Sequence, residues 1–329
     1  MCSTKKNAYL FNKLEQLRKS PFTNSLEVLN KRAKAKYSQE PLLNALIELN
    51  SPLKHQYINA IDCSSILNAQ GDKLTSRYCG NRFCKVCNRI RTGKLINGYA
   101  NQLLSLKDPQ FLTLTIPNVS ALELRDTVKN MGKTMRKIQD NRRKNDLPLI
   151  KGVRKLECTY NTNLNNYHPH YHLIIESETI ANEVINEWLL YYPEANIKAQ
   201  KTVTATDCKE LFKYFTKLTS KTGTNYKNGS KLVDEWHYPE AIDQIFQSIA
   251  NLRIIQPMGG IKIVKDDVDD VESIDLDETV KIEPGINLYT WYNDNWVDFT
   301  TGEQFTSFKP PKNLQYFRNK IKKIPKFIT

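Results

Sequence analysis

Two strand-like runs, joined by a stretch rich in turn-forming residues, constrain the fold of this chain most strongly. The runs cover residues 153–161 (VRKLECTYN) and 168–176 (HPHYHLIIE), and the sequence NTNLNN lies between them. This pattern predicts an antiparallel hairpin. If its turn centres on residues 163–164, residue i faces residue 327 − i, so Glu157 lies directly opposite His170 on the same face.

Histidines are concentrated in the second run. Three of the five in the chain lie there, at His168, His170 and His172. Side chains two apart on a strand point the same way, so His170 and His172 share a face with Glu157. Two imidazoles and one carboxylate suit Mg²⁺ or Mn²⁺, with other transition metals left open. The alternative is that these histidines are surface or packing residues.

A second group of chemically useful residues is predicted on one helix face. Residues 207–220 have a helical pattern that begins at Asp207, a favourable N-cap. Glu210, Tyr214 and Lys217 follow one another at helical spacing and share a face. A tyrosinate can attack phosphorus, a cation can stabilise the developing charge, and a carboxylate can activate water. A helical tyrosine is more often a packing residue, so this pattern is weak by itself.

Four of the seven cysteines gather in a short segment. Cys63, Cys79, Cys84 and Cys87 have the spacing C-x15-C-x4-C-x2-C. Four thiolates can complete a tetrahedral Zn²⁺ site, with Cys63 the least certain ligand and His55 a spare one. A redox-active cysteine pair and unrelated thiols are the alternatives.

The charge distribution indicates a polyanionic partner. The chain carries +13, yet residues 266–283 hold nine acids against one base, so the remainder carries +21. Such a basic body is typical of nucleic-acid-binding proteins, although a soluble basic protein without that role remains the alternative. A dense basic group beside the cysteines is expected to contact phosphates and comprises Arg77, Arg82, Lys85, Arg89, Arg91 and Lys94.

The remaining pattern predicts helices and strands in alternation. We expect an N-terminal helical segment, a strand at residues 110–116, a strand pair at 286–300, and helices at 120–145, 180–195 and 239–250. The N-terminus has no signal-peptide pattern and no apolar run reaches the length of a membrane span, so an intracellular, cytoplasmic protein without membrane contact is expected.

These motifs, in this order, resemble the plasmid rolling-circle replication initiators. These are Rep proteins of the HUH endonuclease superfamily, in the branch with a single catalytic tyrosine. The resemblance runs from about Cys63 to about residue 265 and includes RYCGNRFCKVC, FLTLTIPN, GVRKLECTYN, HPHYH and ELFKYFTK. It implies an α+β fold whose central antiparallel sheet is flanked by helices, with a Cys-rich, zinc-binding-like insertion before it.

The resemblance also implies a site-specific nickase that initiates and terminates plasmid rolling-circle replication. Tyr214 matches the nucleophile that forms a 5′-phosphotyrosyl bond at the origin and frees a 3′-OH. His170 and His172 match the metal-binding pair, Glu157 the acidic position in the preceding strand, and Glu210 the carboxylate that activates water at termination. The expected partners are single-stranded or melted hairpin origin DNA, a host helicase and a DNA polymerase.

A domain organisation follows from the motifs and the resemblance. It comprises a helical segment at 1–55, a Cys-rich zinc- and DNA-binding segment at 56–95, the nickase domain at 96–265, an acidic linker at 266–285 and a small C-terminal segment with a basic tail at 286–329. Two alternatives stay open. One is an HUH transposase or relaxase, and the other is a non-enzymatic, zinc-dependent DNA-binding regulator.

Overall fold

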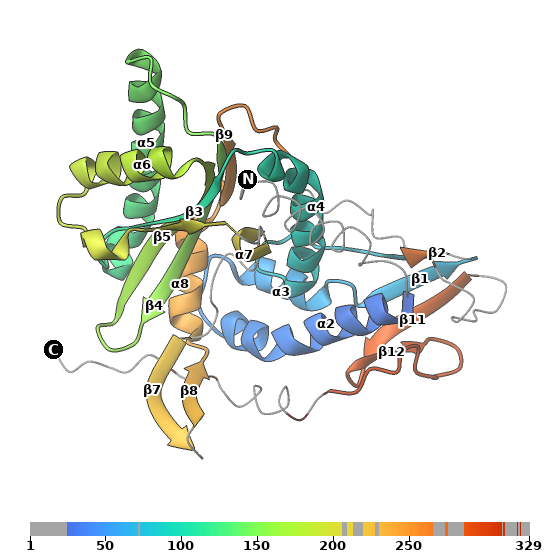
Figure 1. Ribbon diagram of the computed structural model, residues 1–329. Helices are drawn as coiled ribbons and strands as arrows, with labels where there is room; N and C mark the ends of the chain where they lie inside the picture. The colour runs from blue at the N-terminus through green and yellow to red at the C-terminus, as the bar shows by residue number, and fades with distance from the viewer. Residues whose placement is uncertain are drawn as a thin grey trace. The chain divides into compact units, whose positions relative to one another are not determined.

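The computed structural model (Figure 1) describes residues 25–71, 73–205, 209–212, 220–227, 230–265, 274–275 and 286–310, together with 312, 321 and 323. The chain divides into two compact units. We call them the histidine unit, whose described residues lie within 94–265 and include residue 323, and the cysteine unit, whose described residues lie within 25–93 and 274–321. Each is described by itself.

The histidine unit is built on a five-stranded antiparallel sheet. Its order is β6 (Lys201–Thr204), β3 (Pro109–Thr115), β5 (Asn166–Glu176), β4 (Gly152–Asn161) and β9 (Ile255–Met258). The two long central strands, β4 and β5, are the predicted hairpin. The central antiparallel sheet expected from the sequence is therefore confirmed.

The hairpin register is also the predicted one. Glu157 pairs with His170 and Asn161 with Asn166. Asn165 closes the turn with a positive φ of 47°, a conformation that asparagine tolerates, and its side chain accepts a hydrogen bond from the Tyr160 hydroxyl. At the other end, a Cβ on Gly152 would approach the carbonyl oxygen of Ile174 to 2.0 Å, so only glycine fits there.

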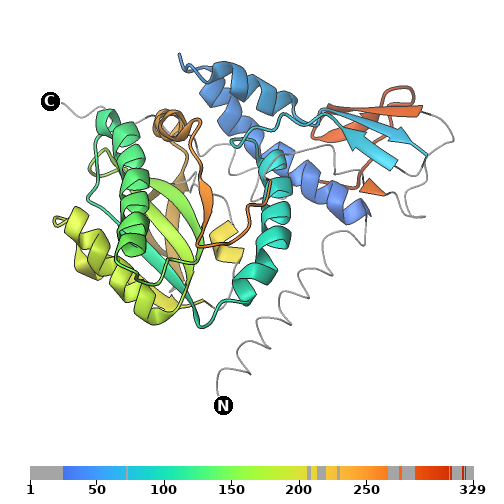
Figure 2. The same ribbon diagram turned by 90° about the horizontal axis from the view of Figure 1, so that it is seen from above.

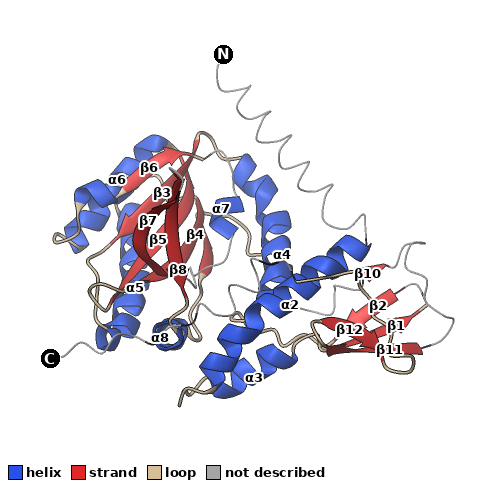
Figure 3. Ribbon diagram, turned by 90° about the horizontal axis from the view of Figure 1, so that it is seen from below, coloured by secondary structure: helices blue, strands red, loops and turns tan. Residues whose placement is uncertain are grey.

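Helices cover the two faces of this sheet differently. Helices α5 (Ala121–Lys144) and α6 (Glu178–Tyr191) lie on one face, and the short α7 (Lys209–Phe212) lies on the other (Figures 2 and 3). Trp188 of α6 packs edge-on against Tyr171 of β5, and its indole N–H donates to the Thr115 carbonyl. The α5 and α6 face is therefore the Tyr171 face, and α7 lies on the histidine face.

Other elements complete the unit. Helix α8 (Pro239–Ile249) contacts α5 and β4, and a short 3-10 helix, η1, covers Ile197–Ala199. Strands β7 (Ser220–Lys227) and β8 (Ser230–Trp236) form a separate antiparallel pair. Helix α4 (Lys85–Leu104) contributes Tyr99, whose ring stacks on that of Phe212 in α7 with centroids 5.8 Å apart.

Residues 1–24 of the expected N-terminal helical segment, most of the acidic linker at 266–285 and most of the chain beyond residue 310 lie outside the described residues. Elsewhere the predicted helices and strands are found, with one difference. The helix expected over 207–220 is described only at α7, and Ser220 already begins β7. Alternating polar and β-branched residues in the sequence SKTGTNYK favour a strand from that point. Residues 213–219 lie outside the described residues.

The cysteine unit packs a helix on a second antiparallel sheet. Helices α2 (Ser25–Ile47) and α3 (Lys54–Asp62) precede a sheet of order β10 (Ile274–Asp275), β2 (Lys73–Ser76), β1 (Ile66–Gln70), β11 (Ile286–Tyr292) and β12 (Asn295–Asp298). Its core comprises Val28, Leu29, Ala33, Leu67, Ala69, Leu74, Tyr289 and Trp296. The strand pair predicted at 286–300 therefore completes a sheet begun more than 200 residues earlier.

None of the helices that the structure describes has a stretch long and apolar enough to span a membrane.

Candidate metal centres

Glu157, His170 and His172 converge on the histidine face of the sheet. One ligand atom of each lies within 4.8 Å of the others. Oε2 of Glu157 is 3.6 Å from Nε2 of His170 and 3.5 Å from Nε2 of His172. Glu157 and His170 are buried, and His172 is partly exposed, so the group opens to solvent on one side. The donor set of two nitrogens and one oxygen fits a divalent cation.

The second ring nitrogen of each histidine is already engaged. Nδ1 of His170 lies 3.0 Å from the His168 carbonyl oxygen, so Nδ1 carries the proton. Nδ1 of His172 lies 3.1 Å from the hydroxyl oxygen of Thr113. These contacts orient both rings and direct each Nε2 atom toward Glu157, as is usual for metal-binding histidines. Thr113 lies opposite His172 in the neighbouring strand β3, so the contact that orients the His172 ring follows from the strand register.

A buried lysine completes the surroundings of Glu157. The Lys155 ammonium donates to Oε1 of Glu157 at 2.6 Å, and Lys155 is completely buried. Burial by itself raises the pKa of Glu157, but the contacts with His170, His172 and Lys155 outweigh burial and lower the pKa. Glu157 is therefore a carboxylate at neutral pH. Lys155 was not among the residues predicted from the sequence, although its position two residues before Glu157 places it on the same face.

The first histidine of the motif lies beside this group. Nδ1 of His168 is 2.9 Å from the amide oxygen of Asn118, and its ring stacks on that of His170. Burial and, to a smaller extent, the charge of His170 lower the pKa of His168 to about 4. Within the described residues, His168 is not part of the cluster of metal-ligating atoms, in line with its omission from the expected ligands.

The expected catalytic helix reaches the histidine face at α7. Helix α7 contacts β4 and β5, the two strands that carry Glu157, His170 and His172. Leu211 and Phe212 are buried and anchor it. Glu210 lies in α7, but its side chain is outside the described residues, as are Tyr214 and Lys217. Tyr214 follows the end of α7 by two residues.

In the cysteine unit, the four predicted cysteines meet in one place. Their sulfur atoms all lie within 4.8 Å of one another, with Cys63 and Cys87 3.4 Å apart and Cys79 and Cys87 3.6 Å apart. Four thiolates about 2.3 Å from a tetrahedral Zn²⁺ would lie about 3.8 Å apart. Hydrogen bonds with Cys79, Cys84 and Cys87, together with burial, raise the pKa of Cys63. Four thiols this close would therefore need a cation to ionise together. His55 is absent from this cluster and instead contacts Asn59.

The backbone around the cysteines is arranged as for a metal knuckle. The amide of Cys79 lies 3.5 Å from the Cys63 sulfur and donates to it, and the amide of Asn81 donates to the Cys79 sulfur at 3.4 Å. Gly80 turns the chain with a positive φ of 62°. The buried Lys36 of α2 donates to the carbonyl oxygens of Ile61 and Cys63, which fixes the loop that carries Cys63. No sequence motif singles out Lys36.

The six basic residues beside the cysteines do not act as one exposed group. Lys85 donates to the backbone and hydroxyl oxygens of Ser38, and burial lowers its pKa to about 8. Arg91 is buried and donates to the Gly80 carbonyl. Both therefore support the fold around the cysteines.

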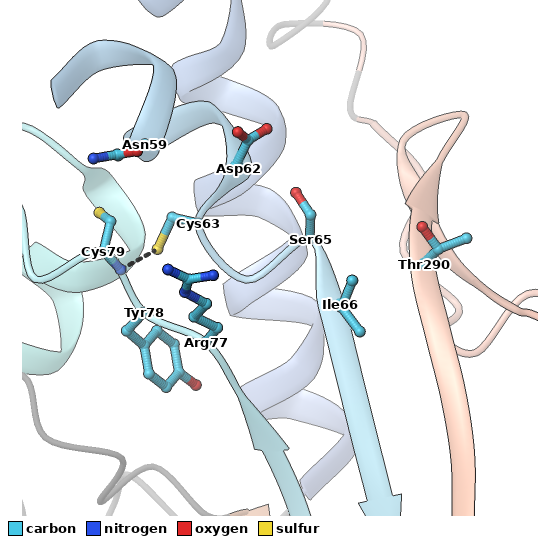
Figure 4. Close-up of a pocket in the computed structure, with 9 residues that line it drawn as sticks. All are labelled: Asn59, Asp62, Cys63, Ser65, Ile66, Arg77, Tyr78, Cys79 and Thr290. Carbon is cyan, nitrogen blue, oxygen red and sulfur yellow. Dashed lines mark hydrogen bonds between the residues drawn. The ribbon is translucent and has the colours of Figure 1, made fainter. Parts of the chain in front are cut away.

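Arg77, in contrast, is exposed and lines a pocket of about 550 Å³. Tyr78, Asn59, Cys63 and Cys79 line the same pocket (Figure 4).

Comparison with known proteins shows similarity to replication proteins. A family model described as "Replication protein" matches residues 72–180. "Protein rep" of Staphylococcus aureus is 36% identical over 127 residues, which cover 35% of this chain and 55% of that protein. "Protein rep" of Lentilactobacillus hilgardii is 26% identical over 247 residues, which cover 62% of this chain and 74% of that protein. "Protein rep" of Streptococcus pneumoniae is 31% identical over 108 residues, covering 30% of this chain and 32% of that protein.

The match with the first of these relatives spans about half of that relative's length. The segment matched by the family model contains three of the four clustered cysteines, both strands of the hairpin, and the complete group of Glu157, His170 and His172. No solved structure matches the chain significantly.

Proposed function

We propose, from the replication-protein domain that residues 72–180 carry, that this chain is a plasmid replication initiator that nicks and rejoins one strand of origin DNA. One observation carries the proposal. Glu157, His170 and His172 converge on the face of the sheet that α7 covers, and the chain leads from α7 directly to Tyr214. A phenol, a carboxylate and a divalent-cation site are the groups that a tyrosine-dependent nickase needs.

The proposed chemistry is a reversible transesterification. The Tyr214 phenol loses its proton, its oxygen bonds to the scissile phosphorus, and the bond from phosphorus to the 3′ oxygen breaks. The 3′ oxygen takes up a proton, and the 5′ phosphate stays on the tyrosine. The free 3′-OH then primes a host polymerase. Because the phosphotyrosyl ester retains the energy of the phosphodiester, rejoining requires no cofactor hydrolysis.

The residues of the histidine face have separate roles in this proposal. His170, His172 and Glu157 would hold Mg²⁺ or Mn²⁺. When bound, the ion withdraws charge from the scissile phosphate as that charge develops. Lys217 adds positive charge next to the tyrosine. Glu210 activates water, which releases the product at the end of a replication round.

The cysteine unit has a binding role in this proposal. Cys63, Cys79, Cys84 and Cys87 would hold Zn²⁺, which would stabilise the loop from which Arg77 extends. The Arg77 guanidinium suits a phosphate, and the ring of the adjacent Tyr78 suits an unpaired base. Arg82, Arg89 and Lys94 are proposed as further phosphate contacts. Single-stranded or melted origin DNA is the substrate.

The test uses the purified full-length chain, Mn²⁺ and labelled single-stranded DNA from the cognate origin. A covalent protein–DNA adduct forms with the wild-type chain and is lost in Tyr214→Phe. Tyr226→Phe and the exposed Tyr292→Phe serve as controls, and both retain the adduct. Unchanged adduct in Tyr214→Phe overturns the assignment. Loss in both Tyr214→Phe and Tyr226→Phe indicates a two-tyrosine enzyme of the transposase or relaxase type.

A further inference from the structure

A completely buried lysine lies inside the candidate cation site. Lys155 is 0% exposed and pairs with His172 across the β4–β5 ladder, so its side chain is on the histidine face. Its ammonium lies 2.6 Å from Oε1 of Glu157. Lysine is among the residues least often buried, and a buried ammonium is retained only where a partner compensates for lost hydration.

The two carboxylate oxygens of Glu157 have different surroundings. Oε1 accepts from Lys155, whereas Oε2 lies 3.5 to 3.6 Å from the Nε2 atoms of both histidines. A carboxylate free to rotate can offer either oxygen, or both, to a cation. Here the lysine engages one oxygen, so only the other is directed at the imidazoles.

We infer that Lys155 is a positioning residue that fixes Glu157 as a one-oxygen ligand aimed at His170 and His172. This inference rests on the proposed function and adds to it a determinant of how the cation is held. With three protein ligand atoms, a six-coordinate ion such as Mn²⁺ retains three positions for water and for oxygens of the DNA phosphate. A two-oxygen carboxylate would occupy one of these positions and leave less room for the substrate.

Lys155 also carries a positive charge. The direction in which its removal changes the affinity for a divalent cation therefore distinguishes its two possible roles. If Lys155 were only a counter-charge next to Glu157, removing it would tighten the binding of a divalent cation. If it positions Glu157, removing it releases the carboxylate and weakens binding, by the 10- to 100-fold that is typical for losing a residue that orients a metal ligand. The two roles therefore predict opposite changes.

The experiment measures Mn²⁺ binding to the full chain without DNA, from the electron paramagnetic resonance signal of free Mn²⁺. Lys155→Met is expected to raise the Kd by about 10- to 100-fold. Lys151→Met is the matched control, because Lys151 immediately precedes β4 but is partly exposed and lies near Glu176 instead. Its Kd should stay within about twofold. In a Glu157→Gln background, Lys155→Met should add little, because its effect acts through that carboxylate.

An unchanged or lower Kd in Lys155→Met overturns the inference, as does a wild-type chain that binds no Mn²⁺. If circular dichroism shows that Lys155→Met does not fold, Lys155→Gln is used in its place. The inference then requires that Lys155→Gln bind Mn²⁺ at least about threefold more weakly than the wild type. Failure of the proposed function is distinguishable. In that case Tyr214→Phe retains the DNA adduct whatever Lys155→Met does to Mn²⁺ binding.

Discussion

Glu157 lies directly opposite His170 in the β4–β5 hairpin, and Oε2 of the carboxylate is 3.6 Å from Nε2 of the imidazole. The backbone ladder alone thus brings together two residues that are thirteen positions apart in the chain. His172 joins them because it is two residues further along the same strand. The group is consequently held by the most regular part of the fold rather than by loops.

The first prediction follows from this geometry. Glu157→Gln replaces the carboxylate with a neutral amide, and His172→Ala removes a ligand atom. Each should therefore weaken Mn²⁺ binding by at least about 100-fold, which exceeds the loss expected for an orienting residue. His168→Ala is the matched control on the same strand, since its side chain lies outside the cluster while its backbone carbonyl still orients His170. Isothermal titration calorimetry provides the affinities. Equal losses in all three variants would contradict the proposed ligand set.

The second prediction concerns the cysteine cluster. The chain should contain about one Zn²⁺, and Cys84→Ser should lower this content and the melting temperature, because structural zinc contributes directly to folding. Cys158→Ala is the control, since Cys158 is buried in β4 and outside the cluster. Elemental analysis by mass spectrometry measures the zinc. Equal zinc content in wild type and Cys84→Ser would exclude Cys84 as a ligand.

A third prediction assigns the water-activating carboxylate. Glu210→Ala should still form the tyrosyl–DNA adduct but release it at least about 100-fold more slowly, the lower range of the contribution of a general base. The exposed Glu194→Ala is the control. The measurement is a chase of preformed adduct, followed on denaturing gels. Release at the wild-type rate would remove Glu210 from the mechanism.

The fourth prediction is a loss of stability at alkaline pH. Burial, with smaller contributions from Tyr238 and Glu240, raises the pKa of Tyr160 to about 12, and burial also raises the pKa of Tyr167. A phenol whose pKa is raised by folding stabilises the protein fully below its unfolded pKa of about 10, and this contribution is lost as pH rises toward 12.

The urea midpoint should therefore fall between pH 10 and pH 12, and less steeply in Tyr160→Phe than in the wild type. The exposed Tyr191→Phe is the control and should follow the wild-type curve. Identical slopes for wild type and Tyr160→Phe would show that this phenol is not the titrating group.

Much of the histidine unit could be predicted from the sequence, because its signals are local. The alternating runs and the asparagine-rich turn fixed both the hairpin and its register, and therefore the position of Glu157 opposite His170. The motif resemblance to Rep proteins is likewise confirmed by the replication-protein match. Cysteine spacing predicted a cluster that the fold assembles from a loop, a turn and the start of α4.

What could not be predicted depends on contacts between distant segments. Strand β1 pairs with β11 across more than 200 residues, and no local pattern specifies that pairing. Lys85 and Arg91 donate to acceptors at Ser38 and Gly80, which the sequence pattern does not reveal. Both were therefore predicted to contact DNA phosphates, whereas in the structure they support the fold. The relation of Tyr214 to the histidines stays a prediction, since Tyr214 lies outside the described residues.

The proposal that Tyr214 attacks DNA beside a cation site is best tested by identifying the residue that becomes linked to DNA. The wild-type chain is incubated with Mn²⁺ and single-stranded origin DNA, the adduct is digested with nuclease and protease, and the modified peptide is sequenced by mass spectrometry. We expect a 5′-phosphate ester on Tyr214 in the wild type and no ester in His172→Ala. An ester on a different residue, or undiminished modification of Tyr214 in His172→Ala, would contradict it.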